Sequence, residues 1–223
     1  MGKLIYGRNS VLDALKNKLP ITKLYLMKTP DFSFEKDINV IVTNKKEMDK
    51  ILRENHQGYI AELKEFNYYT LDEIFKDKPE NVLVLDHIQD PHNFGAILRS
   101  ANAAGVKHII IPKDRAVSVT PTVLKVSSGG FVGIKIIKVG SLVDAIQKLK
   151  KKDFWVYASA LEKATDVDLV SFNKPTVLIV GNEHKGVSRS LLKVSDQNVY
   201  INMKGNVQSL NVSVATGILL FKL

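Results

Sequence analysis

The sequence predicts an α/β protein in which a small α/β domain precedes a larger domain built on a parallel sheet. From Val82 onward, short apolar runs alternate with stretches of helical period, which is typical of parallel strands covered by helices on both faces. The chain has 223 residues, 45% of them hydrophobic, which is enough for a sizeable core. No apolar run reaches membrane-spanning length and no signal-peptide core is present, so we expect a cytoplasmic protein with no membrane partner.

Residues 1–63 are predicted to form the small domain. Gly7, Arg8 and Asn9 precede its first helix, and an arginine in a glycine-flanked loop can bind a phosphate through two hydrogen bonds. An ordinary loop leading into a helix is the alternative interpretation. Periodicity predicts helices at 10–16 and 45–55 and strands at 21–27, 38–42 and 57–63.

Residues 64–81 carry many charges, Pro79 and no clear period, so we predict a linker with a short helix near 71–75. Residues 82–223 are predicted to form the second domain. Its expected strands lie at 82–85, 108–111, 134–137, 154–158, 177–180 and 199–201. Its expected helices lie at 93–104, 120–128 and 142–151, with a last one that begins near Ser209 as its N-cap.

The net charge of +9 is unevenly distributed along the chain. Residues 81–223 hold 18 Lys or Arg against 10 Asp or Glu, whereas residues 1–80 hold 14 against 13. A basic domain favours a polyanionic partner such as RNA, although a generally lysine-rich composition is an equal alternative. The absence of cysteine excludes disulfides, thiolate metal sites and a cysteine nucleophile.

Polar side chains follow three of the predicted strands, in segments 86–100, 181–186 and 201–217. In a parallel sheet, ligands bind beyond the carboxyl ends of the strands, so these segments are expected to converge on one site. His87 and His92 with nearby aspartates could suggest a metal, but no second ligand cluster supports one, and we predict none. Glycine-rich dinucleotide and phosphate loops and a serine-hydrolase motif are also absent.

These segments resemble the three signature motifs of the SpoU/TrmH family of RNA ribose 2′-O-methyltransferases, within the SPOUT superfamily. The matching stretches are 93–99, 180–186 and 201–215. Residues 1–63 resemble the ribosomal-protein-like (L30e-like) substrate-binding domain of the branch that methylates guanosine in 23S rRNA. The resemblance covers nearly the whole chain, and a mild departure is Asn202, where proline is common.

The resemblance implies a parallel-sheet SPOUT domain with a deep trefoil knot at its C-terminal end, and a homodimer through that domain. It also implies S-adenosyl-L-methionine as cofactor, bound in the knot. The cofactor-binding residues implied are Gly181, Asn182, Ile201, Met203, Leu210 and Ser159.

Arg99 is the key catalytic residue that the resemblance implies, either as the base or as a phosphate clamp. A guanidinium resists deprotonation, which favours the clamp. Asn93, Glu183, Ser209 and Asn211 are expected to orient Arg99, the cofactor and the ribose, although caps and surface positions are their alternatives. Arg8, Asn9 and Arg99 are expected to bind RNA. The RNA is expected to be rRNA, with tRNA methylation or a non-catalytic RNA-binding assembly factor as alternatives.

Overall fold

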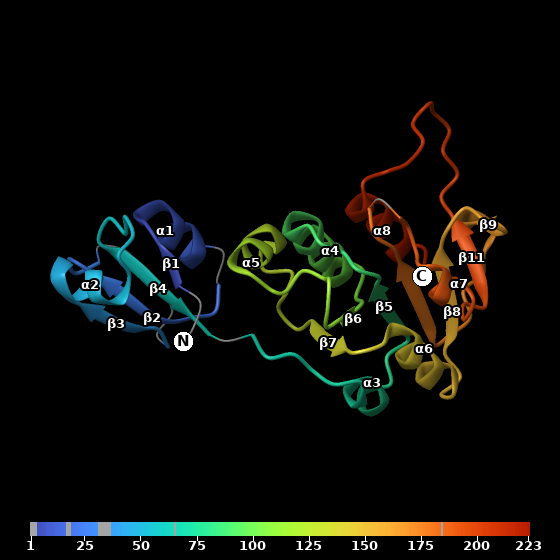
Figure 1. Cartoon of the computed structure of the whole chain (residues 1–223), viewed down its shortest axis with the longest axis horizontal. Coiled ribbons are helices and arrows are strands. Elements are labelled where there is room, and N and C mark those ends of the chain that lie inside the picture. The colour runs from blue at the N-terminus through green and yellow to red at the C-terminus, as the bar shows by residue number, and fades with distance from the viewer. Residues whose placement is uncertain (1–3, 17–18, 31–36, 65, 184) are drawn as a thin grey trace. The chain divides into compact units, whose positions relative to one another are not determined.

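The computed structural model describes residues 4–16, 19–30, 37–64, 66–183 and 185–223. The chain divides into two compact units between Asn67 and Tyr68 (Figure 1). Each unit is built on a sheet of its own.

The first unit has a four-stranded sheet in the order β1-β4-β2-β3, with β2 parallel to β3 and the other pairs antiparallel. Leu24 and Leu26 are buried on one face, and Tyr25 between them lies on the other, as the alternation of a strand requires. The first strand has no counterpart among the predicted ones, because three residues are too few to show a period. The elements are β1 (Leu4–Tyr6), α1 (Arg8–Lys16), β2 (Ile21–Leu26), β3 (Asn39–Val42), α2 (Lys45–Ile51) and β4 (Tyr59–Leu63).

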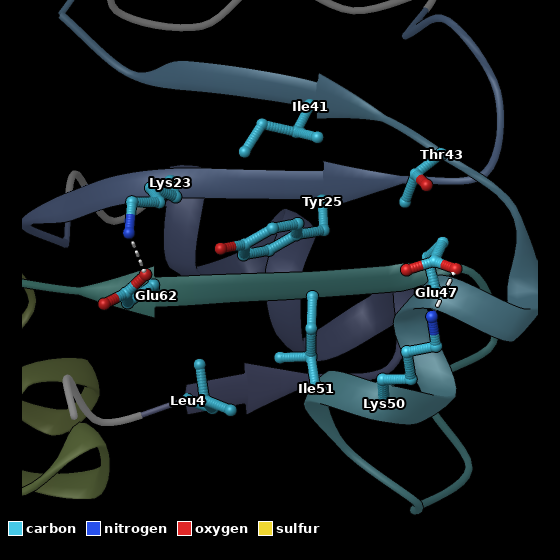
Figure 2. A pocket seen from close by; sticks show the side chains of 9 residues that line it. All are labelled: Leu4, Lys23, Tyr25, Ile41, Thr43, Glu47, Lys50, Ile51 and Glu62. Carbon is cyan, nitrogen blue, oxygen red and sulfur yellow. Dashed lines mark hydrogen bonds and ion pairs between the residues drawn. The ribbon is translucent and has the colours of Figure 1, made fainter.

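One face of this sheet carries a pocket of about 580 Å³ (Figure 2). The ring of Tyr25 lies at its centre, and the apolar side chains around it include Ile41 from β3 and Ile51 from α2. The lysines of this pocket are paired: Lys23 Nζ is 3.0 Å from Glu62 Oε2, and Lys50 Nζ is 2.7 Å from Glu47 Oε1. The rim of the pocket therefore has little net charge.

The second unit has a seven-stranded sheet in the order β7-β6-β5-β10-β8-β11-β9, and all of its strand pairs are parallel. The predicted α/β class with a parallel sheet is confirmed. Within the described ranges, no helix is long and apolar enough to cross a membrane. The strands are β5 (Asn81–Leu85), β6 (His108–Pro112), β7 (Lys135–Val139), β8 (Trp155–Ser159), β9 (Ala164–Asp166), β10 (Thr176–Val180) and β11 (Gln197–Tyr200). The helices are α3 (Asp72–Asp77), α4 (Pro91–Ala103), α5 (Pro121–Ser127), α6 (Leu142–Lys150), α7 (Arg189–Leu192) and α8 (Val212–Leu220), with a 3-10 turn at Val167–Leu169.

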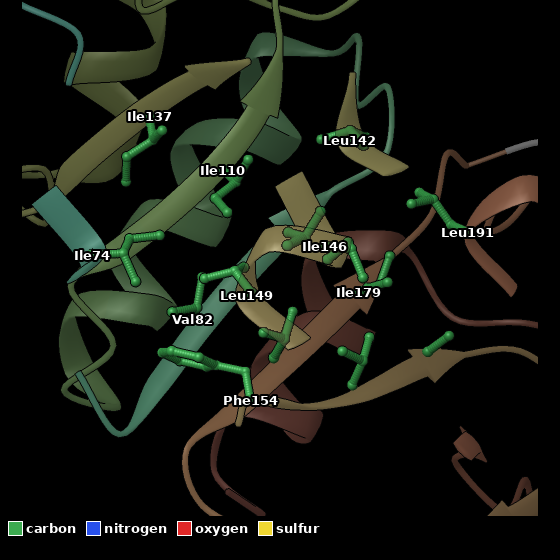
Figure 3. Packing of buried hydrophobic residues seen from close by; sticks show 14 of the residues in the cluster. Ile74, Val82, Ile110, Ile137, Leu142, Ile146, Leu149, Phe154, Ile179 and Leu191 are labelled. Atoms are coloured by element: carbon green, nitrogen blue, oxygen red, sulfur yellow. The ribbon is translucent and has the colours of Figure 1, made fainter. Parts of the chain in front are cut away.

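Helices cover the two faces of this sheet in two groups. On one face, Val82 and Ile179 of the central strands pack with Ile146 and Leu149 of α6 and with Leu191 of α7 (Figure 3). Each of these side chains is at most 1% exposed, and burial of one such side chain contributes about 1.5–3 kcal/mol. The second group contains α4, which packs against both α5 and α8. The core therefore fixes the ends of the strands after which the polar segments begin.

Helix α3 attaches the start of the second unit to the edge of its sheet. Ile74 is fully buried, and the backbone N–H of Tyr69 donates to Ile136 of the edge strand β7 at 2.9 Å. Residues 68–81, assigned to a linker from the sequence, thus pack against the second unit. The charged, proline-containing sequence of this segment did not reveal the packing, because the residues that it contacts lie far away in the sequence.

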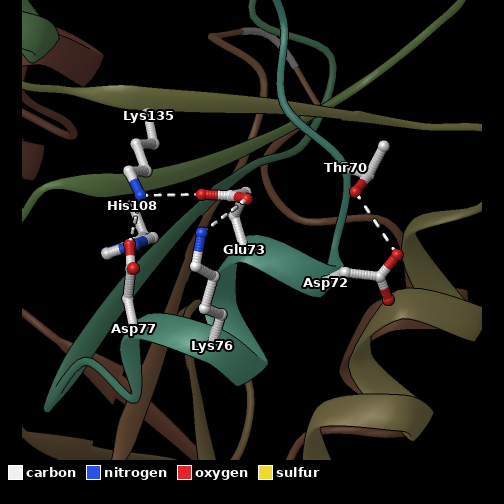
Figure 4. Close-up of polar contacts among 7 residues, drawn as sticks. All are labelled: Thr70, Asp72, Glu73, Lys76, Asp77, His108 and Lys135. Carbon is white, nitrogen blue, oxygen red and sulfur yellow. Dashed lines mark hydrogen bonds and ion pairs between the residues drawn. The ribbon is translucent and has the colours of Figure 1, made fainter.

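A cluster of charged groups fixes α3 in place (Figure 4). Lys135 Nζ lies 2.7 Å from Glu73 Oε2 and 2.6 Å from Asp77 Oδ2, and His108 Nε2 lies 2.8 Å from the same Asp77 oxygen. The hydrogen bond from Lys135 lowers the pKa of both carboxyl groups, and the same contacts raise the pKa of Lys135. The charges of this cluster are therefore satisfied within the fold.

Candidate active site

The three polar segments meet at the carboxyl end of the larger sheet. They follow β5, β10 and β11, which are parallel and lie within four neighbouring strands of the sheet. Parallel strands end at the same edge, so the loops that follow them lie together. His184, inside the second segment, lies outside the described residues.

Asn93 joins the three segments through hydrogen bonds. It lies in the first turn of α4 and is 8% exposed. Its Nδ2 donates to Glu183 Oε1 at 2.9 Å, and its Oδ1 accepts from Asn211 Nδ2 at 3.0 Å. Asn211 Oδ1 in turn accepts from the backbone N–H of Ser213 at 2.8 Å. Since a buried amide is costly when unpaired, this chain of bonds fixes the three segments relative to one another.

The last helix begins at Val212 with Asn211 as its N-cap, so the predicted start near Ser209 is wrong. Serine and asparagine are comparable caps by composition, but Asn211 also bonds Asn93, and that tertiary contact selects it. Ser209 lies in the preceding loop, where its side chain is exposed. The loop between β11 and α8 is therefore longer than predicted.

A pocket of about 630 Å³ lies between the loops at 159–162, 180–187 and 200–212. All six residues predicted to bind the cofactor line it, together with Glu183, Ser209 and Asn211 of the predicted catalytic set. The pocket has further lining residues that were not among the predicted site residues. They include Leu161, Glu162, Lys185, Val187, Leu192 and Tyr200.

Gly181 is required where the pocket wall turns back on itself. Asn182 and Gly186 exchange backbone hydrogen bonds of 3.1 and 2.9 Å, which closes the loop tightly. A Cβ at position 181 would lie 2.0 Å from the carbonyl carbon of Gly186. Only glycine fits there, and its backbone is open to the pocket.

Asp86 fixes the loop that follows β10, a role that the sequence did not suggest. Its carboxylate is 2% exposed, and Oδ2 accepts from the backbone N–H of Ser188 at 2.7 Å. The other oxygen, Oδ1, is 2.6 Å from His87 Nδ1, and the His87 carbonyl accepts from Asn182 Nδ2 at 2.9 Å. The aspartate and histidine that could have suggested a metal thus serve to tie two segments together.

Arg99 lies on α4, six residues beyond Asn93, and does not line the pocket. Its side chain is exposed, and no described residue forms an ion pair or hydrogen bond with its guanidinium. The turn after α5 packs on its backbone: a Cβ at Gly130 would lie 2.6 Å from the Arg99 Cα. The structure therefore fixes the backbone of Arg99 and leaves its charge available to a ligand.

The predicted RNA-binding residues of the first unit lie at the start of α1. Arg8 and Asn9 are exposed, and the turn before them is held by Gly7 and Gln57. Gly7 has a φ of +86° and donates its N–H to Tyr59 O at 3.1 Å, while Gln57 Oε1 accepts from the Arg8 N–H at 3.1 Å. This turn is fixed while both side chains remain accessible to a ligand.

Two known sequence families match the chain. The one described as the SpoU rRNA Methylase family matches residues 80–221. The one described as RNA 2′-O ribose methyltransferase substrate binding matches residues 4–69. Together they span both units of the structure.

Relatives and solved structures agree with these matches. YacO of Bacillus subtilis, named as a TrmH family tRNA/rRNA methyltransferase, is 31% identical over 232 residues, which cover 98% of this chain and 93% of YacO. An rRNA methyltransferase from Sinorhizobium meliloti, solved with AdoMet bound, has a TM-score of 0.69 at 28% identity and covers 98% of this chain and 85% of that one. AviRb from Streptomyces viridochromogenes, a SpoU methyltransferase solved in complex with AdoMet, has a TM-score of 0.72 at 22% identity, with 99% and 88% covered, and shares the fold.

Proposed function

Because the chain belongs to the SpoU rRNA methylase family, we propose that it transfers a methyl group from S-adenosyl-L-methionine to a ribose 2′-hydroxyl of RNA. The observation that carries this proposal is the pocket of about 630 Å³ at the carboxyl end of the sheet, whose wall contains the Glu183 and Asn211 ends of the Asn93 hydrogen-bond chain. A pocket for the cofactor and a fixed polar wall beside it are what a group transfer between two bound molecules requires.

The residues of the pocket fit S-adenosyl-L-methionine. Ile201 and Leu210 offer apolar surface for a flat base, the turn at Gly181 offers backbone groups for hydrogen bonds, and Glu183 and Glu162 offer carboxylates toward a positive charge. The bound cofactor would supply a methyl group on a sulfonium centre, from which a neutral thioether departs as a good leaving group, and the proton of the 2′-hydroxyl would pass to water. The cofactor-binding set of this proposal consists of Gly181, Asn182, Ile201, Met203, Leu210 and Ser159.

Arg99 binds the RNA phosphate next to the reacting ribose and stabilises the charge that develops on the 2′-oxygen. A guanidinium has five donors and keeps its proton at physiological pH, which suits it to this clamp and not to the role of base. Asn93, Glu183, Asn211 and Ser209 hold the pocket wall and the ribose in position. Their part is orientation, since small displacements of the reacting atoms cost large factors in rate.

The last helix supports a homodimer in this proposal. Val214, Ile218 and Phe221 follow one another at helical spacing on α8, and their side chains are 50%, 37% and 67% exposed. An apolar stripe of this kind on a surface helix fits a subunit interface. Arg99 does not line the pocket of its own chain, which is in keeping with a site shared between two subunits.

The deep knot and the ribosomal-protein-like character of the first unit belong to the same proposal. In support of the knot, the chain leaves β11 near one edge of the sheet and returns through the 201–211 loop, so that α8 packs on α4, the helix that follows the central strand β5. In support of a substrate domain, the first unit matches the family described as substrate binding and presents Arg8 and Asn9 at a fixed turn.

The RNA in this proposal is rRNA, with a guanosine of 23S rRNA as the preferred target. The match at 28% identity to a protein titled an rRNA methyltransferase supports rRNA, whereas the name of YacO includes both tRNA and rRNA, so tRNA remains the second candidate. The pocket that fits the cofactor favours catalysis over a role in assembly alone, because a binding-only protein needs no cofactor pocket.

Transfer of a tritium-labelled methyl group tests the function. The purified chain is incubated with labelled S-adenosyl-L-methionine and with rRNA or tRNA that lacks the modification, and the RNA is then hydrolysed in alkali. A 2′-O-methyl group removes the nucleophile of alkaline cleavage, so we expect the label in alkali-resistant dinucleotides. Label in mononucleotides would indicate base methylation, and no label in any RNA would contradict the proposal.

A further inference from the structure

A second pocket of the larger unit, about 500 Å³ in volume, lies at the amino end of the sheet, opposite the candidate active site. Three turns form it, each leading into one of the neighbouring strands β5, β10 and β8. Residues 78–80 precede β5, residues 174–175 precede β10, and residues 152–154 precede β8. Because these strands are parallel and adjacent, the turns that enter them lie side by side.

The floor of this pocket is apolar and rigid. Ile74 and Phe154 belong to the core cluster and are 0% and 7% exposed, and Figure 3 shows both at its border. Phe75, Pro79 and Pro175 complete the apolar lining. Aromatic and proline rings of this kind offer flat surfaces on which a planar ring can stack.

The charged side chains that line this pocket are mostly basic. Each turn contributes one lysine, Lys78, Lys152 and Lys174, against the single carboxylate of Glu80. In the described part of the chain none of these lysines forms an ion pair, whereas both lysines of the pocket in the first unit do (Figure 2). Lys174 Nζ donates to Asn81 Oδ1 and, at 3.0 Å, to the carbonyl oxygen of Leu223, and partial burial lowers its pKa. Three lysines against one carboxylate leave a net positive charge, which a bound anion would neutralise.

From this combination we infer that the pocket is a second RNA-binding site, which holds one nucleotide away from the reacting one. The base stacks on the partly exposed rings of Phe75, Pro79 and Pro175, and the phosphates contact the lysines. The inference rests on the proposed function for the identity of the polyanion. Neither the sequence motifs nor the family matches single out these residues.

A nucleotide within RNA fits better than a free one. Free nucleotides bind parallel sheets at the carboxyl end, where helix N-termini stabilise the charged phosphate. At the amino end this pocket offers Lys78, Lys152 and Lys174, and separate lysines suit the single charges of successive phosphodiesters. Residues 81–223 also hold 18 basic against 10 acidic residues, as expected for a unit that follows a phosphate backbone.

The test compares the wild type with Lys78→Asn/Lys152→Gln. Asparagine is chosen at position 78 because that residue has a φ of +49°, which asparagine tolerates. Lys174 is left in place because it bonds Asn81 and Leu223. The matched control is Lys148→Gln/Lys151→Gln, which removes the same charge from exposed positions outside the pocket.

Two readouts are used on the full-length proteins. Fluorescence anisotropy with a labelled RNA stem-loop that has a single-stranded tail gives the affinity and its salt dependence. Quenching of Trp155, the only tryptophan, reports binding near the amino end of the sheet, since this residue is 42% exposed and donates its backbone N–H to Pro175. Guanosine monophosphate serves as the free nucleotide in a second titration.

We expect RNA to quench Trp155 in the wild type and in the control. In the pocket variant we expect affinity to fall about tenfold and the salt slope to fall by about two, one for each lysine. Cofactor affinity should remain that of the wild type, which excludes misfolding. RNA affinity and quenching unchanged in the pocket variant would overturn the inference. A pocket variant that binds guanosine monophosphate more weakly but binds RNA as the wild type does would also overturn the inference.

The outcome for this pocket is separable from the proposed function. A wild type that methylates RNA, with a pocket variant that binds RNA equally well, refutes only the second site. A wild type that neither binds nor methylates RNA refutes both.

Discussion

Two polar networks in the larger unit differ in what they leave unpaired. At the carboxyl end of the sheet, Asn93 joins Glu183 and Asn211 through hydrogen bonds of 2.9 and 3.0 Å, and the nearest cation along the helix, Arg99, has no partner among the described residues. At the β6–β7 edge, Lys135 is bonded to both Glu73 and Asp77, at 2.7 and 2.6 Å.

This difference indicates a structural role for the Lys135 cluster and a binding role for Arg99. A lysine with two carboxylates has no charge left for a ligand, so the edge cluster stabilises the position of α3. An exposed arginine on a fixed backbone, beside polar groups that satisfy one another, keeps its guanidinium for an external anion. An exposed cation without a partner among the described residues, on the helix that carries the Asn93 network, is therefore the basis on which we propose that Arg99 binds RNA.

The largest expected effect comes from Arg99→Ala. Loss of the clamp should lower single-turnover methyl transfer by about a thousandfold or more, because electrostatic groups of this kind supply several kcal/mol in the transition state. Cofactor affinity, measured by calorimetry in the presence of a chelator, should stay near that of the wild type. Lys107→Ala, which removes an exposed charge just before β6, is the control and should retain full rate. Transfer at the wild-type rate by Arg99→Ala would remove Arg99 from the site.

Removal of the first unit should have the next largest effect. A chain that starts at Tyr68 keeps the contacts of Tyr69 and α3 with the second unit, so it should fold and bind the cofactor. Methylation of structured RNA should fall about a hundredfold, because Arg8 and the rest of the substrate domain are missing. A truncated chain with full activity on rRNA fragments would show that residues 1–67 have no part in substrate binding.

Asn93→Ala should have a smaller effect on transfer and a measurable one on stability. It leaves Glu183 and Asn211 without their shared partner, and because both are exposed to water the loss costs about 0.5–1.5 kcal/mol of unfolding free energy. The transfer rate should fall about tenfold as the pocket wall loosens. Asn102→Ala, on the same helix but bonded to Val132 O, is the matched control. Equal effects of the two variants on the rate would contradict the role of the Asn93 chain.

Lys135→Met should leave transfer unchanged and lower the melting temperature by a few degrees. Lys135 lowers the pKa values of Glu73 and Asp77 in the folded state. The two ionised carboxylates therefore stabilise the fold fully above the ordinary carboxyl pKa. This stabilisation is lost as the pH falls through the lowered pKa values. The difference in melting temperature between wild type and variant should thus be constant from about pH 7 to 5 and shrink below about pH 4.

The matched control for this pH dependence is Lys138→Met. Lys138 lies on the same strand, but its Nζ lies over the ring of Tyr68 and donates to Ser118 Oγ. Its effect on the melting temperature should not change with pH on the acid side. A difference for Lys135→Met that persists at low pH would show that carboxylates do not carry the effect.

Much of the fold could be predicted from the sequence because the central strands are buried on both faces. Runs such as Val82–Leu85 and Val177–Val180 leave no polar position, which only a covered parallel strand allows. The three polar segments could be predicted to converge for the same reason, since parallel strands end at one edge. The roles assigned to the residues of these segments stay predictions.

The contacts that connect the segments could not be predicted. Asp86 with Ser188, and Gly130 with the backbone of Arg99, are pairs far apart in the sequence that no local pattern marks. The start of α8 at Val212 depends on a similar contact, because Asn211 is held by Asn93. Local capping preferences do not distinguish Ser209 from Asn211, so the tertiary bond decides between them.

The most direct test of the account is a map of 2′-O-methylated nucleotides in total rRNA and tRNA from cells with and without this chain. The account predicts that loss of the chain removes methylation at a defined ribose of rRNA, a guanosine of 23S rRNA in the preferred form. Wild-type protein should restore the mark, and Arg99→Ala, which still binds the cofactor, should not. An unchanged methylation map, or restoration of the mark by Arg99→Ala, would contradict it.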